Sequence, residues 1–466
     1  MLHGGANLSF SNPAWIRSDD GITVNESPAI LLTRDRNAVW HPFTQHGLGQ
    51  VPLAVASASG SYLVDTDGRR YLDMISSWWV NLHGHGREEL AEAVREQVLR
   101  LDHVQFAGTT HEPAVRLAEG LLERAGLTGR AKVFFSDNGS TAVEVALKIA
   151  RQHWVNRGEE RPLFVTLEGA YHGDTAGSMS VGRSSGFFEA FRGMMFETVS
   201  LPVPLVWNGF DNVSGENDSL GRAEELLRKS SGRIAALIAE PLVQGAGGMR
   251  FHSARFLSRL AALFRSHGIP VILDEVMTGF GRTGSFFAYQ RTDFVPDLLC
   301  LSKGITGGIL PLAATIASET LFGSFLGENF RTALAHGHSY TANPVSCAAA
   351  LASLDLHEAT RSLEQVERIN RALARGLEHL ALLPGILRPR TLGAVAALDL
   401  AGGEGYSSPV GRTIALRALE LGLIVRPLGN VLYLMPPYCT TDGEIDNAFR
   451  ILRDILSKPS QYHRTK

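Results

Sequence analysis

The stretch "KVFFSDNGSTAVEVALKIARQHW", residues 132–154, decides the fold class. It begins with a short apolar run, and from Ser140 onward apolar residues recur at the spacing of one helix face, so we predict a strand that turns directly into a helix. The same alternation continues along the chain. Further strands are predicted at 163–167 (LFVTL), 234–240 (IAALIAE), 270–276 (PVILDEV) and 297–302 (DLLCLS).

Helical segments separate these strands, as in "SARFLSRLAALFRSHG" at 253–268, which ends at a glycine. Strands that alternate with helices favour a mainly parallel sheet, and strands this continuously apolar are expected to be covered on both faces. We therefore predict an α/β fold with a large domain whose mainly parallel sheet is covered by helices.

The two ends of the chain have a different pattern. "GSYLVDTDGRRYLDM" at 60–74 predicts a β-hairpin around its Asp-Gly turn, and beyond residue 360 helices and strands alternate irregularly. We predict that these ends form a smaller α+β domain: an N-terminal segment and hairpin at 1–78, the large domain at 79–351 and the C-terminal small domain at 352–466. The polar stretch "FDNVSGENDS" at 210–219 is predicted to be a mobile surface loop.

The composition narrows the possible functions. The chain has 466 residues, 44% of them hydrophobic and 20% charged, with a formal net charge of -3. This balance argues against disorder, and without a block of lysine or arginine it favours small-molecule chemistry over nucleic-acid or membrane binding. Cys300, Cys347 and Cys439 lie far apart, which favours reduced, structural thiols. The first residues do not form a signal peptide, so we expect a cytoplasmic protein.

A candidate anion site lies inside the opening stretch. Gly139 and Ser140 stand between a predicted strand and a predicted helix, and a helix start presents unpaired N–H groups that can hold a phosphate. Asp137, Asn138 and Ser140 are also ordinary helix-capping residues. The stretch alone leaves both interpretations open.

A second glycine pattern follows the strand at 270–276. Gly279, Gly281 and Gly284 have the spacing of a dinucleotide-binding motif. The next residues, "SFFAYQRTDF", lack the amphipathic helix on which a pyrophosphate would lie. A glycine turn packed near a site is therefore the preferred interpretation.

Two charged residues end neighbouring strands. Asp274 follows "VIL" and Lys303 follows "LLCLS", and the carboxyl ends of parallel strands meet at the ligand-binding edge of the sheet. A buried carboxylate needs a cation or a hydrogen-bond donor. We expect Asp274 and Lys303 at one site, although a helix cap and a solvated lysine are the alternatives.

Paired histidines raise the question of a metal. His83 and His85, and again His336 and His338, stand two residues apart without an acid or cysteine at a ligand-like spacing. We predict no metal site. A serine hydrolase is also disfavoured, because the chain has no G-x-S-x-G elbow.

Taken together, these features are similar to those of a pyridoxal-phosphate enzyme, with Tyr171 in "GAYHGDT" as a further element. The chain resembles the class III (ω-amino acid type) aminotransferases of fold type I through "DEVMTGFGRTG", "LSKGITGG" and "HGHSYTANP", and the resemblance runs from about residue 38 to the C-terminus. It implies that Lys303 forms a Schiff base with pyridoxal 5'-phosphate, that Asp274 pairs with the pyridinium nitrogen and that Tyr171 stacks on the ring.

The same resemblance assigns the phosphate. It implies that the Gly139 and Ser140 amides hold it, and that Ser339 reaches the phosphate of a neighbouring subunit, which makes the protein a homodimer with shared sites. A catalytically silent protein on the same scaffold is the alternative from another class, and the presence of both Lys303 and Asp274 argues against it.

Within the family, "VWHPFTQ", "SSWWVNLHGHG", "EPLVQGAGGMR" and "LIVRPLGNVLYLMPPY" are similar to the branch that acts in biotin synthesis. This implies transfer of an amino group from S-adenosyl-L-methionine to 8-amino-7-oxononanoate, which gives 7,8-diaminononanoate. Another ω-amine with a 2-oxo acid acceptor is the alternative reaction. The implied substrate-binding residues are Trp78 with its neighbour Trp79, Gly337, Arg426 for the carboxylate, Tyr433 and Phe43.

Phe43 departs from the better-known members, which have a tyrosine after Trp-His-Pro. A hydroxyl expected near the substrate is therefore absent. Both S-adenosyl-L-methionine and lysine stay open as the amino donor.

Overall fold

The computed structural model describes residues 17–18, 21–22, 27–182, 188–402, 405 and 408–458. The chain divides into two compact units, Met1–Ala58 with Tyr62–Tyr71, and Ser59–Ser61 with Leu72–Lys466. The boundaries at 78 and 351 stay a prediction, and part of the predicted N-terminal segment, 1–16 included, lies outside the described residues.

A seven-stranded sheet forms the centre of the second unit, in the order β6-β14-β13-β12-β9-β7-β8. Four of its six strand pairings join predicted strands to one another or to β8, and these four, which run in the order β13, β12, β9, β7 and β8, are parallel. Only β14 runs antiparallel to both of its neighbours. The strands are β6 (Ala131–Ser136), β7 (Leu163–Leu167), β8 (Thr198–Leu201), β9 (Ile234–Ala239), β12 (Val271–Asp274), β13 (Leu298–Leu301) and β14 (Ala313–Ser318). The predicted mainly parallel sheet is confirmed.

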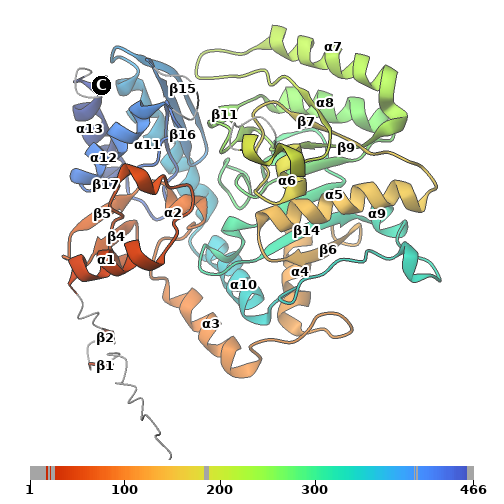
Figure 1. Cartoon of the computed structure of the whole chain (residues 1–466), viewed down its shortest axis with the longest axis horizontal. Coiled ribbons are helices and arrows are strands. Elements are labelled where there is room, and N and C mark those ends of the chain that lie inside the picture. Colours follow the sequence, from red (N-terminus) through yellow and green to blue (C-terminus); the bar gives the residue numbers. More distant parts are fainter. Residues whose placement is uncertain are drawn as a thin grey trace, which may run out of the picture. The chain divides into compact units, whose positions relative to one another are not determined.

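Helices cover this sheet. The opening stretch forms β6 followed by α5 (Gly139–Asn156), which contacts β14, β13 and β9 through a row of buried apolar residues (Figure 1). Asn138 starts the helix with a capping box that includes Thr141. The helix therefore begins at a fixed point beside the end of β6, and this places its first amides at the carboxyl edge of the sheet.

The predicted loop at 210–219 is wrong. Asn212 accepts a hydrogen bond from the amide of Gly215 and caps α7 (Val213–Ser230), which lies beside α8 (Ala254–Ser266; Figure 1). Glu216 is fully buried in this helix and pairs with Arg255 of α8. The polar residues that indicated a loop are a helix cap and the buried carboxylate of an ion pair whose arginine is half exposed.

The C-terminal part of the second unit contains a three-stranded antiparallel sheet, in the order β15-β16-β18. Helix α11 packs on β15 and β16 and contacts α13 (Figure 1). The elements are α11 (Ser362–Leu380), β15 (Ile386–Leu392), β16 (Val395–Leu400), α12 (Pro409–Glu420), β17 (Leu423–Ile424), β18 (Val431–Leu434) and α13 (Asp442–Leu456).

The predicted hairpin at 60–74 is confirmed. Strand β4 (Tyr62–Asp65) neighbours β5 (Arg70–Asp73) and β3 (Val55–Ser59), and Asp65 and Arg69 close the turn between β4 and β5. The last two residues of β5 belong to the second unit, where they pair in parallel with β17. This pairing brings the chain after residue 73 next to the C-terminal strands.

The rest of the described chain forms further helices and strands. They are β1 (Arg17–Ser18), β2 (Gly21–Ile22), α1 (Pro28–Ala38), α2 (Ser76–Trp79), α3 (Glu88–Arg100), α4 (Glu112–Arg124), α6 (Ala176–Val181), β10 (Val243–Gln244), β11 (Arg250–Phe251), α9 (Glu319–Gly323) and α10 (Pro344–Ala359). Within the described residues, none of the helices has both the length and the apolar composition to cross a bilayer.

Candidate active site

A cavity of about 620 Å³ opens at the carboxyl edge of the seven-stranded sheet. The ends of β12 and β13, the start of α5 and the loop at 171–175 surround it. Its volume is in the usual range for small-molecule sites. Five of the predicted site residues line it: Gly139, Ser140, Tyr171, Asp274 and Lys303.

Asp274 and Lys303 meet here because of the strand register. Strands β12 and β13 are parallel with Asp274 opposite Cys300, and Lys303 follows three residues later. The Asp274 carboxylate is buried; its Oδ1 accepts a hydrogen bond from the amide of Val276 at 3.0 Å, and its Oδ2 lies 2.7 Å from Nδ1 of His172. These contacts fix the carboxylate in the cavity wall.

The Lys303 amine is set up to lose its proton. Its Nζ lies 4.9 Å from the centre of the Trp79 ring. Desolvation lowers the pKa of the amine, although the carboxylates of Asp274 and Glu240 oppose this shift. A neutral amine in this place can attack a carbonyl carbon.

Tyr171 is held by two carboxylates. Its hydroxyl donates to Asp174 at 2.9 Å and its amide donates to Glu240 at 3.0 Å. Burial raises the pKa of the phenol, so the side chain stays neutral. Tyr171 therefore offers a fixed aromatic ring to the cavity.

The start of α5 provides an anion site. The side-chain oxygen of Asn138 accepts a hydrogen bond from the amide of Thr141. In the part of the chain that the structure describes, no protein atom accepts a hydrogen bond from the amides of Gly139 and Ser140. A side chain at position 139 would collide with Val276, because its Cβ would lie 2.6 Å from that residue's Cγ1. Glycine is therefore required where the backbone approaches the cavity.

Glu240 of this site was missed, and His172, in the motif "GAYHGDT", was assigned no role of its own. Glu240 is buried, accepts hydrogen bonds from the amides of Tyr171 and Gly245, and burial together with the Asp274 charge raises its pKa to about 7. It follows the apolar strand β9 as Asp274 ends β12, and these strands are neighbours. The same end-of-strand signal would have found it.

Trp78 and Trp79 lie on a left-handed turn. Four successive non-glycine residues, 76–79, have φ values of 49°, 44°, 70° and 74°. Such a conformation costs about 1–2 kcal/mol for each residue. Trp79 lines the cavity and its Nε1 donates to the hydroxyl of Tyr433 at 3.0 Å, while Arg426 lies 3.6 Å over the Trp78 ring.

The other predicted residues lie away from the cavity. Tyr433 is buried behind Trp79. Gly337 and Ser339 are exposed, although Nδ1 of His338 lies 2.9 Å from a carboxylate oxygen of Asp137, just before α5. Phe43 belongs to the first unit, and its role stays a prediction.

The family of class-III aminotransferases matches residues 43–456 of the chain. Two curated relatives, both named adenosylmethionine-8-amino-7-oxononanoate aminotransferase, are similar over nearly their whole length. The protein from Synechococcus elongatus is 48% identical over 424 residues, which is 90% of this chain and 98% of that protein. The protein from Geobacter sulfurreducens is 42% identical over 427 residues, which is 88% of this chain and 94% of that protein.

Solved structures agree with this match. The structure named adenosylmethionine-8-amino-7-oxononanoate aminotransferase from Methanocaldococcus jannaschii has a TM-score of 0.86 and 33% identity, and the comparison covers 93% of this chain and 99% of that one. A PLP-bound amine transaminase from an uncultivated Pseudomonas species has a TM-score of 0.85 and 34% identity, with coverage of 90% and 98%.

Proposed function

The chain belongs to the class-III aminotransferases, which use pyridoxal 5'-phosphate, and from that premise we propose that it transfers an amino group from S-adenosyl-L-methionine to 8-amino-7-oxononanoate. The product is 7,8-diaminononanoate, in biotin synthesis. The observation that carries this proposal is the 48% identity, over 98% of its length, to a relative named for this reaction.

The cavity fits the cofactor. Among the described residues no protein atom accepts from the amides of Gly139 and Ser140, and the α5 dipole adds positive potential, as a phosphate requires. The absence of a Cβ at Gly139 leaves the backbone open there. Asp274 would pair with the ring nitrogen, and Tyr171 would cover one face of the ring.

When bound, the cofactor carries the amino group between the two substrates and accepts electrons from the carbon that loses its proton. Lys303 supplies the rest of this chemistry. Its Nζ, with a lowered pKa, would anchor the cofactor and, once released, would take the proton from the donor carbon and deliver it to the cofactor's C4' carbon. In the second half of the reaction Lys303 returns a proton to the carbon of the former keto group.

Asp274 would pair with the ring nitrogen and favour its protonated form. Its carboxylate is already oriented by Val276 and His172 before a ligand enters, so little reorganisation is needed. Glu240, with a pKa raised to about 7, adds little negative charge below that pH. This leaves Asp274 as the principal anion facing the ring nitrogen.

Arg426 binds the carboxylate of 8-amino-7-oxononanoate, because a guanidinium can donate to both oxygens at once. Trp78 and Trp79 supply apolar walls for the substrate chain, and an aromatic face also attracts a sulfonium donor. Tyr433 acts on the pocket through Trp79, to which it is hydrogen bonded. Gly337 and Phe43 complete the proposed substrate-binding set.

The proposal includes a cytoplasmic homodimer with shared sites, in which Ser339 reaches the phosphate bound by a second copy. Its support is the exposure of Ser339 and of large apolar side chains on the same stretch of chain. Leu326 is 63%, Phe330 79% and Tyr340 62% exposed. A second copy that covers these side chains would remove apolar surface from water.

The test is a product assay with 8-amino-7-oxononanoate as acceptor, and S-adenosyl-L-methionine or lysine as donor. We expect 7,8-diaminononanoate with S-adenosyl-L-methionine, and none from the Lys303→Ala control. If product forms with lysine and not with S-adenosyl-L-methionine, the proposed acceptor is correct and the donor is lysine. No product with either, but turnover of an ω-amine with pyruvate, would contradict the proposal.

A further inference from the structure

The turn that carries Trp78 and Trp79 has a backbone conformation that its own residues do not favour. Left-handed backbone is disfavoured for each of its residues, and none is a glycine. Such a conformation persists only where surrounding groups impose it. The residues that impose it therefore decide where both tryptophan rings lie.

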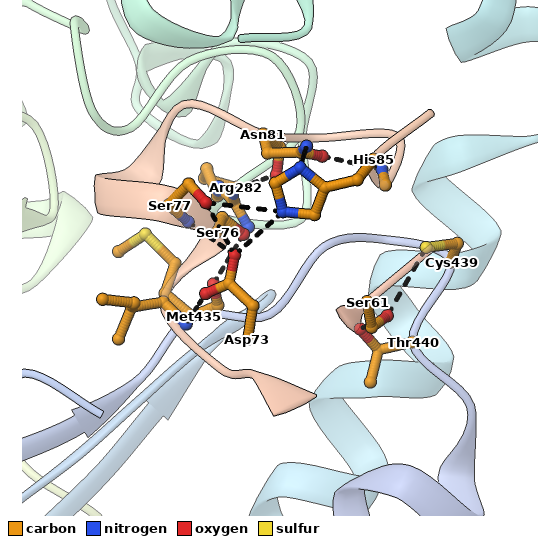
Figure 2. A network of polar contacts seen from close by, with 12 residues as sticks. Ser61, Asp73, Ser76, Ser77, Asn81, His85, Arg282, Met435, Cys439 and Thr440 are labelled. Carbon is orange, nitrogen blue, oxygen red and sulfur yellow. Dashed lines mark hydrogen bonds and ion pairs between the residues drawn. The ribbon is translucent and has the colours of Figure 1, made fainter. Parts of the chain in front are cut away.

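One buried carboxylate binds the start of this turn (Figure 2). Asp73 is fully buried at the end of β5. Its Oδ1 accepts from the amide of Ile75 at 3.1 Å, and its Oδ2 accepts from the amide and hydroxyl of Ser77 at 2.8 and 3.0 Å. These bonds fix the two residues on either side of Ser76.

His85 completes the set of donors around Asp73. The amide of Gly84 donates to Oδ1 of Asn81 at 2.7 Å, so the Asn81 side-chain nitrogen faces Nδ1 of His85 at 3.0 Å. The remaining nitrogen, Nε2, carries the proton and points to Asp73 Oδ2 at 3.2 Å. The turn is thereby enclosed by hydrogen bonds that begin at residue 73 and end at residue 85.

A second anchor comes from the glycine motif at 279–284. Arg282, at the centre of that motif, is buried and donates to the carbonyls of Pro436 at 2.7 Å and Asn81 at 3.2 Å. The hydroxyl of Ser76 donates to the carbonyl of Met435 at 2.7 Å. The turn is thus tied to the segment that follows β18.

We propose that Asp73, oriented by His85, is a positioning residue for amino transfer that sets the substrate-facing wall formed by Trp78 and Trp79. Within the part of the chain that the structure describes, neither Asp73 nor His85 lines the cavity. Asp73 acts through the turn and touches no reacting atom. This inference rests on the proposed function for the reaction that the turn serves. The way in which Asp73 holds the turn rests on the hydrogen bonds alone.

The test compares Asp73→Asn with wild type in both half-reactions. The amide keeps the size of the side chain but places an N–H₂ group against the donors of Ser77 and His85. We expect kcat/KM for the acceptor to fall about 10- to 100-fold, mainly through KM, because a small displacement of a substrate wall is costly. Cofactor absorbance and attachment at Lys303 stay unchanged. The exposed Asp67→Asn is the matched control.

A second substitution separates positioning from stability. Glycine adopts left-handed backbone without a Cβ penalty. Ser77→Gly in the Asp73→Asn background therefore reduces the stabilisation that the hydrogen bonds to residue 73 must provide to keep the turn left-handed. We expect the double variant to recover at least about threefold in acceptor KM. If Asp73→Asn does not fold, His85→Ala, which removes one donor of the four, gives a smaller change in the same direction.

Two results would overturn the inference. One is a kcat and KM within twofold of wild type for Asp73→Asn, and the other is a lower melting temperature with no change in KM. The measurements use whichever acceptor the wild-type protein turns over. If the wild-type protein does not turn over 8-amino-7-oxononanoate, another acceptor is used. The ratio of the acceptor KM of the variant to that of wild type still tests the role of the turn.

Discussion

Two buried aspartates, Asp274 and Asp73, have nearly the same surroundings. Each ends a β-strand, each accepts a hydrogen bond from the amide two residues ahead, and each has a histidine nitrogen next to Oδ2. Asp274 leaves part of its carboxylate facing the cavity, whereas Asp73 directs both oxygens to protein donors and accepts four hydrogen bonds.

This difference separates chemistry from positioning. A carboxylate in a cavity wall that can still accept further hydrogen bonds can act on a ligand. A carboxylate whose oxygens already accept hydrogen bonds from its own chain can only fix the shape of that chain. We infer that the sheet edge around Asp274 and Lys303 sets the rate of transfer. The turn anchored by Asp73 sets how the substrate is held.

The largest expected effect is at the sheet edge. Lys303→Ala removes the proposed cofactor anchor and proton carrier, so kcat should fall by at least about 1,000-fold while the fold is kept. Single-turnover kinetics with a donor amine measure it. The exposed Lys229→Ala serves as control and should retain wild-type rates. If a Lys303→Ala variant still transaminates, the sheet edge around Lys303 does not set the rate of transfer, and the proposed difference between the two regions is wrong.

Asp274→Asn should have the next largest effect. The amide cannot stabilise a protonated ring nitrogen, so we expect kcat to fall about 100- to 1,000-fold with little change in acceptor KM. Asp73→Asn should change mainly KM. Steady-state kinetics of the two variants side by side test the comparison directly, and the same split between kcat and KM in both would refute it.

Arg426→Lys should weaken acceptor binding about 10- to 100-fold and leave the donor half-reaction unchanged. A lysine keeps the charge but cannot donate to both carboxylate oxygens in one plane, nor lie flat on Trp78. Acceptor KM and binding calorimetry on the loaded enzyme measure it. An unchanged acceptor KM would place the carboxylate elsewhere.

The smallest effect concerns pH. The pKa of Glu240 is raised from 4.5 to about 7, so the folded protein binds a proton that the unfolded chain has lost, and stability falls as pH rises through this window. The slope contributed by this residue is at most about 1.4 kcal/mol per pH unit. Unfolding of the cofactor-free protein between those pH values should show a flatter slope for Glu240→Gln. Parallel slopes for both proteins would contradict the shift.

The sheet edge could be predicted because its signals are local. Continuous apolar runs are typical of strands covered on both faces, and Asp274 and Lys303 stand directly after such runs. Strand β14 escaped prediction because four of the six residues in "AATIAS" are small, and only Thr315 and Ile316 have the β-branched side chains that mark a strand. Glu240 followed the same rule as Asp274 and was overlooked.

The turn could not be predicted from local preferences. Nothing in "SSWW" favours left-handed backbone, since serine and tryptophan both disfavour it. Its shape comes from contacts with Asp73, His85 and Met435, and the last of these is 359 residues away from Ser76. The glycine motif at 279–284 forms the predicted turn, but none of its three glycines is among the residues that line the cavity, and the contacts of Arg282 within it required coordinates.

Chemical trapping identifies the lysine that binds the cofactor. Borohydride reduction of the enzyme loaded with pyridoxal 5'-phosphate makes the bond between a lysine amine and the cofactor aldehyde permanent, and peptide mapping by mass spectrometry then locates it. We expect the added mass on the peptide that contains Lys303, in "CLSKGITGG". Modification of another lysine, with Lys303 unmodified, would contradict it.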